Sequence, residues 1–159
     1  MKHMLLRFSP GFSCSFLSLV LLFTFTTPFF AQDTSAEAAR QRTLMAERYT
    51  TERLWVWQKR LNLLDWNISV AVSRASELKP KTLGNIHWDT NLKQANIGVL
   101  SAYDYTLPTP QMLDDMEFTI VHELVHLHLA SLPRNEASRR TEERAVNELA
   151  AALLRLAKH

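Results

Sequence analysis

The sequence predicts an α+β fold with an N-terminal helix, a small antiparallel or mixed sheet of about three strands, and two packed C-terminal helices. Two segments, residues 35–64 and 110–130, carry apolar side chains at helical spacing. Between them lie three short strand-like runs, and a further helical pattern follows Asn135. The length of 159 residues allows one domain.

Residues 1–31 have the features of a secretory signal peptide, because Lys2 and Arg7 precede an apolar run that ends in a small residue. Phe29 occupies the position three before the expected cut, where a small residue is usual. An uncleaved membrane anchor over residues 12–30 is therefore the alternative. Either form places the remaining chain outside the cytoplasm, as an exported (periplasmic or secreted) protein or as a membrane-anchored one.

Charge and cysteine content exclude some classes of function. Without the leader, the 18 basic residues fall to 16 and equal the 16 acidic ones. Bulk charge then gives no reason to expect a nucleic acid partner. The one cysteine, Cys14, lies in the leader, so no disulfide supports the mature fold, and a bound metal is a plausible staple.

The first helix is expected over residues 35–64. Its early part is polar, and residues 32–49 are interpreted as a helical spacer that precedes the folded domain at residues 50–159. Trp55, Trp57 and Trp66 are expected to be packing residues.

Three strands should follow the first helix. The run from Trp66 to Val72 alternates apolar and polar side chains, Thr82 to Trp88 alternates weakly, and Ala95 to Leu100 is the third. Residues 89–93 are expected to form a hairpin loop, and residues 101–110 lead into the next helix.

The helix over residues 110–130 should begin with Thr109 as its N-cap and Pro110 at its first position. An apolar stripe is expected to face the core: Leu113, Met116, Ile120, Leu124 and Leu127. A narrow solvent-facing strip would hold Asp114, Glu117 and His128. The remaining face, with Asp115, Thr119, His122 and His126, would look into a cleft.

This helix contains the motif His122-Glu123-Leu124-Val125-His126. Residues four apart on a helix lie about 40° apart on one face, so the two imidazoles can share one ion. This spacing is the HExxH zinc signature. Each histidine would supply a neutral nitrogen ligand, and Glu123 would stand beside the metal to take a proton from its bound water.

A hydrolytic zinc needs a third protein ligand, and the last helix offers Glu142 and Glu143. If the two helices are antiparallel and joined by a short turn, both glutamates lie level with His126 along the helix axis. The hydrophobic periodicity of the last helix does not distinguish between them either. Glu148 points away from Glu143 by about 140° and should face solvent. Asn135 is expected to cap this helix, which runs to near Lys158.

The motif, followed by Glu143-Arg144-Ala145-Val146-Asn147-Glu148-Leu149-Ala150, resembles a gluzincin metallopeptidase. It is similar to thermolysin-like enzymes and, with Leu153 and Leu154, to the small ImmA/IrrE-type peptidases. The resemblance implies a minimal zincin-like domain in which Glu143 is the third Zn²⁺ ligand and Asn147 contacts His122. Asn147 stands where thermolysin has an acid, and a signal peptide departs from the intracellular ImmA/IrrE-type proteins, so their substrates do not transfer.

We therefore expect a zinc metallopeptidase that hydrolyses a peptide or protein substrate, with Glu123 as its catalytic base. Candidates for a donor to the oxyanion are Tyr103, Tyr105, His87 and His128, and none is assigned. His128 lies about 200° from His126 on the helix and should not join the metal. By resemblance, residues 95–100 would be the sheet edge that binds extended peptide.

Two alternatives remain at this stage. One is a non-catalytic zinc module in which the same ligands hold two helices together. The other is a binding or adaptor domain at the cell envelope, tethered through an uncleaved leader. Oligomeric state and cleavage preference are not encoded in any pattern found.

Overall fold

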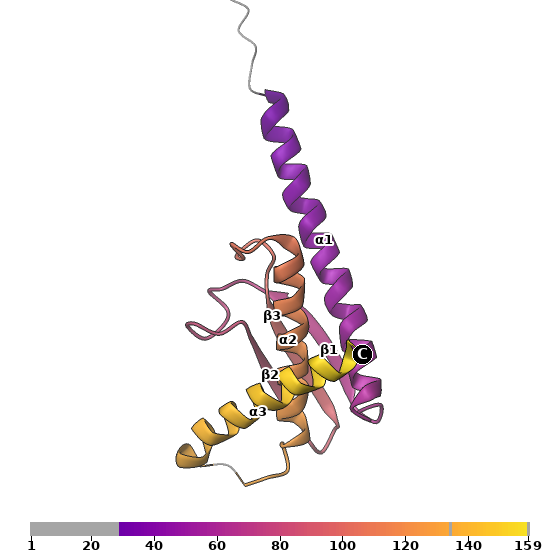
Figure 1. Cartoon of the computed structure of the whole chain (residues 1–159), viewed down its shortest axis with the longest axis vertical. Helices are drawn as coiled ribbons and strands as arrows, with labels where there is room; N and C mark the ends of the chain where they lie inside the picture. Colours follow the sequence, from indigo (N-terminus) through magenta and orange to yellow (C-terminus); the bar gives the residue numbers. More distant parts are fainter. Residues whose placement is uncertain (1–28, 134, 159) are drawn as a thin grey trace, which may run out of the picture.

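The computed structural model describes residues 29–133 and 135–158, arranged as three helices and a three-stranded mixed sheet (Figure 1). The predicted α+β class is confirmed. The predicted signal peptide falls almost entirely on residues 1–28, outside the described residues. In chain order the elements are α1 (Phe29–Arg60), β1 (Asn67–Ser73), β2 (Gly84–Asp89), β3 (Gln94–Leu100), α2 (Thr109–His128) and α3 (Glu136–Ala157).

The element boundaries differ from the predicted ones by a few residues. The first helix ends at Arg60 instead of Leu64, and Asn62 adopts a left-handed conformation with φ of 55° in the turn that follows. Pro108, and not Thr109, is the N-cap of α2, and it makes no side-chain capping bond. The Pro108 side chain has no hydrogen-bond acceptor, which explains why that bond is missing. Pro110 stands in the first turn, where proline is tolerated.

The strand order is β1-β3-β2, with β1 parallel and β2 antiparallel to β3. Ile97 in β3 lies opposite Val70 on one side and Ile86 on the other. The expectation that residues 95–100 form a sheet edge is therefore wrong, because β3 is paired on both sides. The edge that contacts α2 is β2.

The α2 helix packs its apolar stripe into the core. Met116, Ile120 and Leu124 are fully buried, as predicted, and Leu127 is nearly so. They belong to one cluster with Ile97 and Val99 of the central strand. Burying each side chain of this size contributes about 1.5–3 kcal/mol. The opposite face of α2 is thereby held in a fixed direction, toward α3 and the cleft described below.

The α1 helix extends beyond the rest of the molecule at its N-terminal end (Figure 1). Its side chains from Thr34 to Gln41 are exposed, and contact with α2 and the preceding loop begins at Arg42, which donates to the Leu107 carbonyl at 2.6 Å. Ala46 is fully buried. Among the described residues, no helix is both long and apolar enough to cross a membrane.

Two expectations for α1 and α2 side chains are corrected. Trp57 is 2% exposed, but Trp55 is 62% exposed, with the Lys59 amine over its ring. Glu117 does not face solvent. It accepts hydrogen bonds from the Tyr49 hydroxyl at 2.8 Å and from Trp57 Nε1 at 2.7 Å. These contacts form because α1 covers the strip of α2 that was expected to face solvent.

The Glu117 contacts give a first prediction. In Glu117→Ala the buried Trp57 N–H loses its acceptor, which should lower the free energy of unfolding by about 2–3 kcal/mol. Glu117→Gln keeps an acceptor oxygen and should cost about 1 kcal/mol. Urea unfolding measures both, and equal stability of the two variants would contradict the proposed role of Glu117.

Candidate metal centre and its cleft

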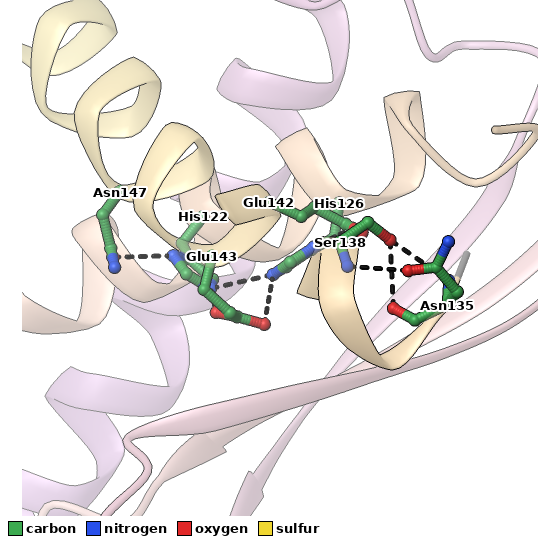
Figure 2. A network of polar contacts seen from close by, with 7 residues as sticks. All are labelled: His122, His126, Asn135, Ser138, Glu142, Glu143 and Asn147. Carbon is green, nitrogen blue, oxygen red and sulfur yellow. Dashed lines mark hydrogen bonds and ion pairs between the residues drawn. The ribbon is translucent and has the colours of Figure 1, made fainter. Parts of the chain in front are cut away.

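Two helices supply the polar residues of the candidate site (Figure 2). His122, Glu123 and His126 lie on α2. Glu142, Glu143 and Asn147 lie on α3, which packs across α2. The start of α3 is fixed by a capping box, since the Asn135 side chain accepts from the Ser138 N–H at 2.8 Å and Ser138 Oγ accepts from the Asn135 N–H. The predicted cap at Asn135 is confirmed.

The inner atoms of this group converge on one point. His122 Nε2 and His126 Nε2 are 3.1 Å apart. The Glu143 carboxylate contributes one oxygen to each ring. Its Oε2 lies 3.5 Å from His122 Nε2, and its Oε1 lies 3.4 Å from His126 Nε2. Ligand atoms that surround a tetrahedral ion at about 2.0–2.1 Å are about 3.3 Å from one another, so these separations fit a shared ion.

The outer imidazole nitrogens are held by oxygen atoms of α3. His122 Nδ1 lies 3.1 Å from Asn147 Oδ1, and His126 Nδ1 lies 3.0 Å from Glu142 Oε1. The predicted contact of Asn147 with His122 is present. The two glutamates that sequence could not separate occupy different places: Glu142 meets the outer nitrogen of His126, and Glu143 faces both inner nitrogens.

These outer contacts determine which nitrogens carry protons. An oxygen acceptor at Nδ1 requires a proton there, so a neutral imidazole presents a lone pair at Nε2. Two such lone pairs and the Glu143 carboxylate then point toward each other, an arrangement that a cation stabilises. His122, Glu123 and His126 also offer ligand atoms within 4.8 Å of one another, so this group could hold a metal ion.

Glu123 differs from the other acids because it is buried, with 6% exposure. Burial, chiefly, and the negative charge of Glu143 raise the pKa of its carboxyl from 4.5 to about 7, while the positive charge of Lys79 acts in the opposite direction. Burial, chiefly, also lowers the pKa of His122. A carboxyl group with a pKa near neutrality can both take and give a proton at physiological pH.

Gly84 brings the edge strand against the helix, a role that the sequence interpretation did not assign. A Cβ atom at this position would lie 2.4 Å from Thr119 Cγ2, 2.7 Å from the Gly98 carbonyl oxygen and 3.5 Å from Glu123 Oε1. No side chain fits there without moving β2 or α2. A glycine inside a strand pattern was the available signal, because such glycines often mark a close backbone approach.

A cleft of about 940 Å³ opens beside the inner atoms. The segment 77–83, strand β2, and helices α2 and α3 form its walls. Its volume falls in the range of small-molecule sites. Thr119, His122, Glu123 and His126 line it, in agreement with the predicted cleft-facing side of α2, whereas Asp115 does not.

Only one of the four candidate oxyanion donors lies in the cleft. His87 lines it from β2. The Tyr103 ring instead stacks on Arg74, Tyr105 is buried in the core, and His128 contacts the Leu61 carbonyl at 2.8 Å. His128 is therefore directed away from the inner nitrogens, as its angle on the helix predicted.

Comparisons with protein-family models, with curated proteins and with solved structures found no match. Any function proposed for this chain therefore rests on the geometry of the site.

The buried Glu123 gives a prediction for the metal-free protein. Between pH 4.5 and 7 the folded state keeps a proton that the unfolded state has lost, so this group lowers stability as pH rises and costs about 3 kcal/mol above pH 7. Chemical unfolding of the chelator-treated full chain should find Glu123→Gln more stable than wild type at pH 8 and similar at pH 4.5. Glu148→Gln, at an exposed position, is the control. A stability difference that is the same at both pH values would contradict the buried, protonated carboxyl.

Proposed function

We propose that this protein is a zinc-dependent peptidase, with His122, His126 and Glu143 as metal ligands and Glu123 as the catalytic base. The observation that supports it best is the convergence of two imidazole nitrogens and the Glu143 carboxylate, at separations of 3.1–3.5 Å, next to a buried carboxyl on the wall of an open cleft. Two imidazole nitrogens and one carboxylate form a ligand set typical of catalytic zinc.

Zinc at this site would supply a Lewis acid for the substrate carbonyl and would lower the pKa of water. The residues of the chain would do the rest. Glu142 and Asn147 would fix the imidazole tautomers through the outer nitrogens. Glu123 would accept a proton from the attacking water and deliver it to the leaving amine, a transfer that its pKa near 7 favours in both directions.

The edge strand supports a peptide as the substrate. The Leu100 N–H donates to the Leu83 carbonyl at 2.8 Å, so the antiparallel alternation turns the backbone groups of Gly84 and Ile86 away from β3. An extended peptide could pair with these groups as an added strand. It would then pass along the wall of the cleft that faces Glu123. Gly84 has no side chain, so it leaves this wall uncovered.

The alternative is a zinc-stabilised binding or adaptor domain at the cell envelope, in which the metal only joins α2 and α3. That role needs the outer contacts of Glu142 and Asn147 but has no use for a buried Glu123 beside an open cleft. We favour the enzyme for this reason. From the leader features of the sequence we infer that it would act outside the cytoplasm, in the periplasm or the medium.

The ligand assignment predicts metal content. The full chain should bind about one zinc per molecule, and Glu143→Ala should weaken binding by about 100-fold or more. Glu142→Gln should weaken it by about 10–100-fold, the usual range for a group that orients a ligand. Metal analysis and competition with a chelator measure both.

Glu148→Ala is the matched control, since Glu148 is an exposed acid five residues after Glu143 on α3. If Glu143→Ala bound zinc as tightly as Glu148→Ala, then Glu143 would not be a ligand, and the assignment of the third ligand would be refuted.

The mechanism predicts the behaviour of Glu123→Gln. This variant should keep its zinc and lose about 10²–10⁴-fold in hydrolysis, because the proton acceptor is removed while the ligands remain. Product analysis on a pool of unstructured decapeptides, with the zinc-loaded full chain, gives the readout. Undiminished cleavage by this variant would refute the mechanism, and no cleavage by zinc-loaded wild type would favour the adaptor.

A further inference from the structure

Three basic residues line the cleft: Lys79, Lys81 and Arg139. No ion pair between side chains that the structure describes includes any of them. Their charges are therefore not engaged in an ion pair with any side chain that the structure describes.

The acids that line the cleft are already engaged. The Glu77 side chain accepts from the Arg74 backbone N–H at 2.7 Å, and Glu142 contacts His126. Glu143 faces the two inner imidazole nitrogens, and Glu123 is buried. A cation held by the histidines would add positive charge to the same cleft.

The basic residues stand at both ends of the candidate metal site. Lys79 and Lys81 belong to the segment that leads into Gly84, which touches Thr119 and lies near Glu123. At the other end, Arg139 precedes Glu143 by four residues on α3 and so lies on the same side of that helix.

The contacts between α2 and α3 show at which end of the site Arg139 lies. Asn147 meets His122 and Glu142 meets His126, so α3 starts beyond His126 and runs back toward His122. Arg139, which comes before Glu142, is therefore at the His126 end. Lys79 and Lys81 are at the end where Gly84 meets Thr119 and Glu123.

We propose that the cleft selects peptides that carry carboxylates on both sides of the cleaved bond. This inference rests on the proposed peptidase function and names its substrate class. A peptide extended along β2 would place acidic side chains near Lys79 and Lys81 on one side and near Arg139 on the other. Positive charge lining a concave site also attracts anionic ligands and repels cationic ones.

The test uses the zinc-loaded full chain and matched peptides whose Asp and Glu residues are replaced by Asn and Gln. An exposed ion pair changes binding by about two- to fivefold, so a peptide with acids on both sides should have a kcat/KM about tenfold above its amide counterpart. The ratio should fall toward one in 0.5 M salt, where charges are screened.

Variants assign each end of the cleft. Lys79→Gln with Lys81→Gln should remove the preference for an acid on one side of the cleaved bond, and Arg139→Gln should remove it on the other. The matched control is Arg40→Gln with Arg48→Gln, which lowers the net charge equally at exposed positions of α1. Amidation of the peptide C-terminus separates a side-chain carboxylate from a terminal one as the recognised group.

A second measurement keeps the two proposals apart. Binding of the same peptides to zinc-loaded Glu123→Gln, followed by fluorescence polarisation, needs no catalysis. Preferential binding of acidic peptides without any hydrolysis by wild type would refute the peptidase and retain the charge selection. Equal cleavage and equal binding of acidic and amide peptides, or a preference unchanged by the cleft variants, would refute the charge selection and leave the peptidase.

Discussion

The two imidazole nitrogens that face each other at 3.1 Å set the constraint on which the rest of the site depends. With protons on their outer nitrogens, both rings present lone pairs to the same point, and the Glu143 carboxylate adds a third group of electron pairs there. While both rings are neutral in this form, their lone pairs oppose one another, and a cation between them would relieve the repulsion. The side-chain contacts of α3 keep the rings in this orientation, because Asn147 and Glu142 each hold one outer nitrogen.

The sequence predicted the local parts of this structure. Spacing on one helix placed His122 beside His126, the stripe through Ile120 marked the buried face, and Asn135 marked the start of α3. Each of these follows from interactions within a few residues. The contact of Asn147 with His122 came only from resemblance to metallopeptidases, because periodicity alone gives an asparagine on a helix no preferred partner.

The long-range parts were not predictable in the same way. Strand order depends on pairing between segments that are distant in sequence, so β3 could not be distinguished from an edge strand by its apolar pattern. Glu117 seemed exposed because its angle on α2 lies away from the core stripe, yet α1 covers that angle and supplies Tyr49 and Trp57 as donors. Tyr105, likewise, lies in the core, where no local pattern had placed it.

Glu142 and Glu143 illustrate why neighbouring acids on one helix can have separate tasks. Consecutive residues are about 100° apart around a helix, so two of them reach a facing helix only from opposite sides of the contact line. One side leads to the outer nitrogen of His126, and the other leads to the inner nitrogens of both rings. The first carboxylate can fix a tautomer, while the second can complete a ligand set. The sequence could not distinguish them, because both lie at a similar position along the helix axis. The burial of Val146 and Ala150 sets the rotation of α3 about its own axis, and this rotation separates the two carboxylates.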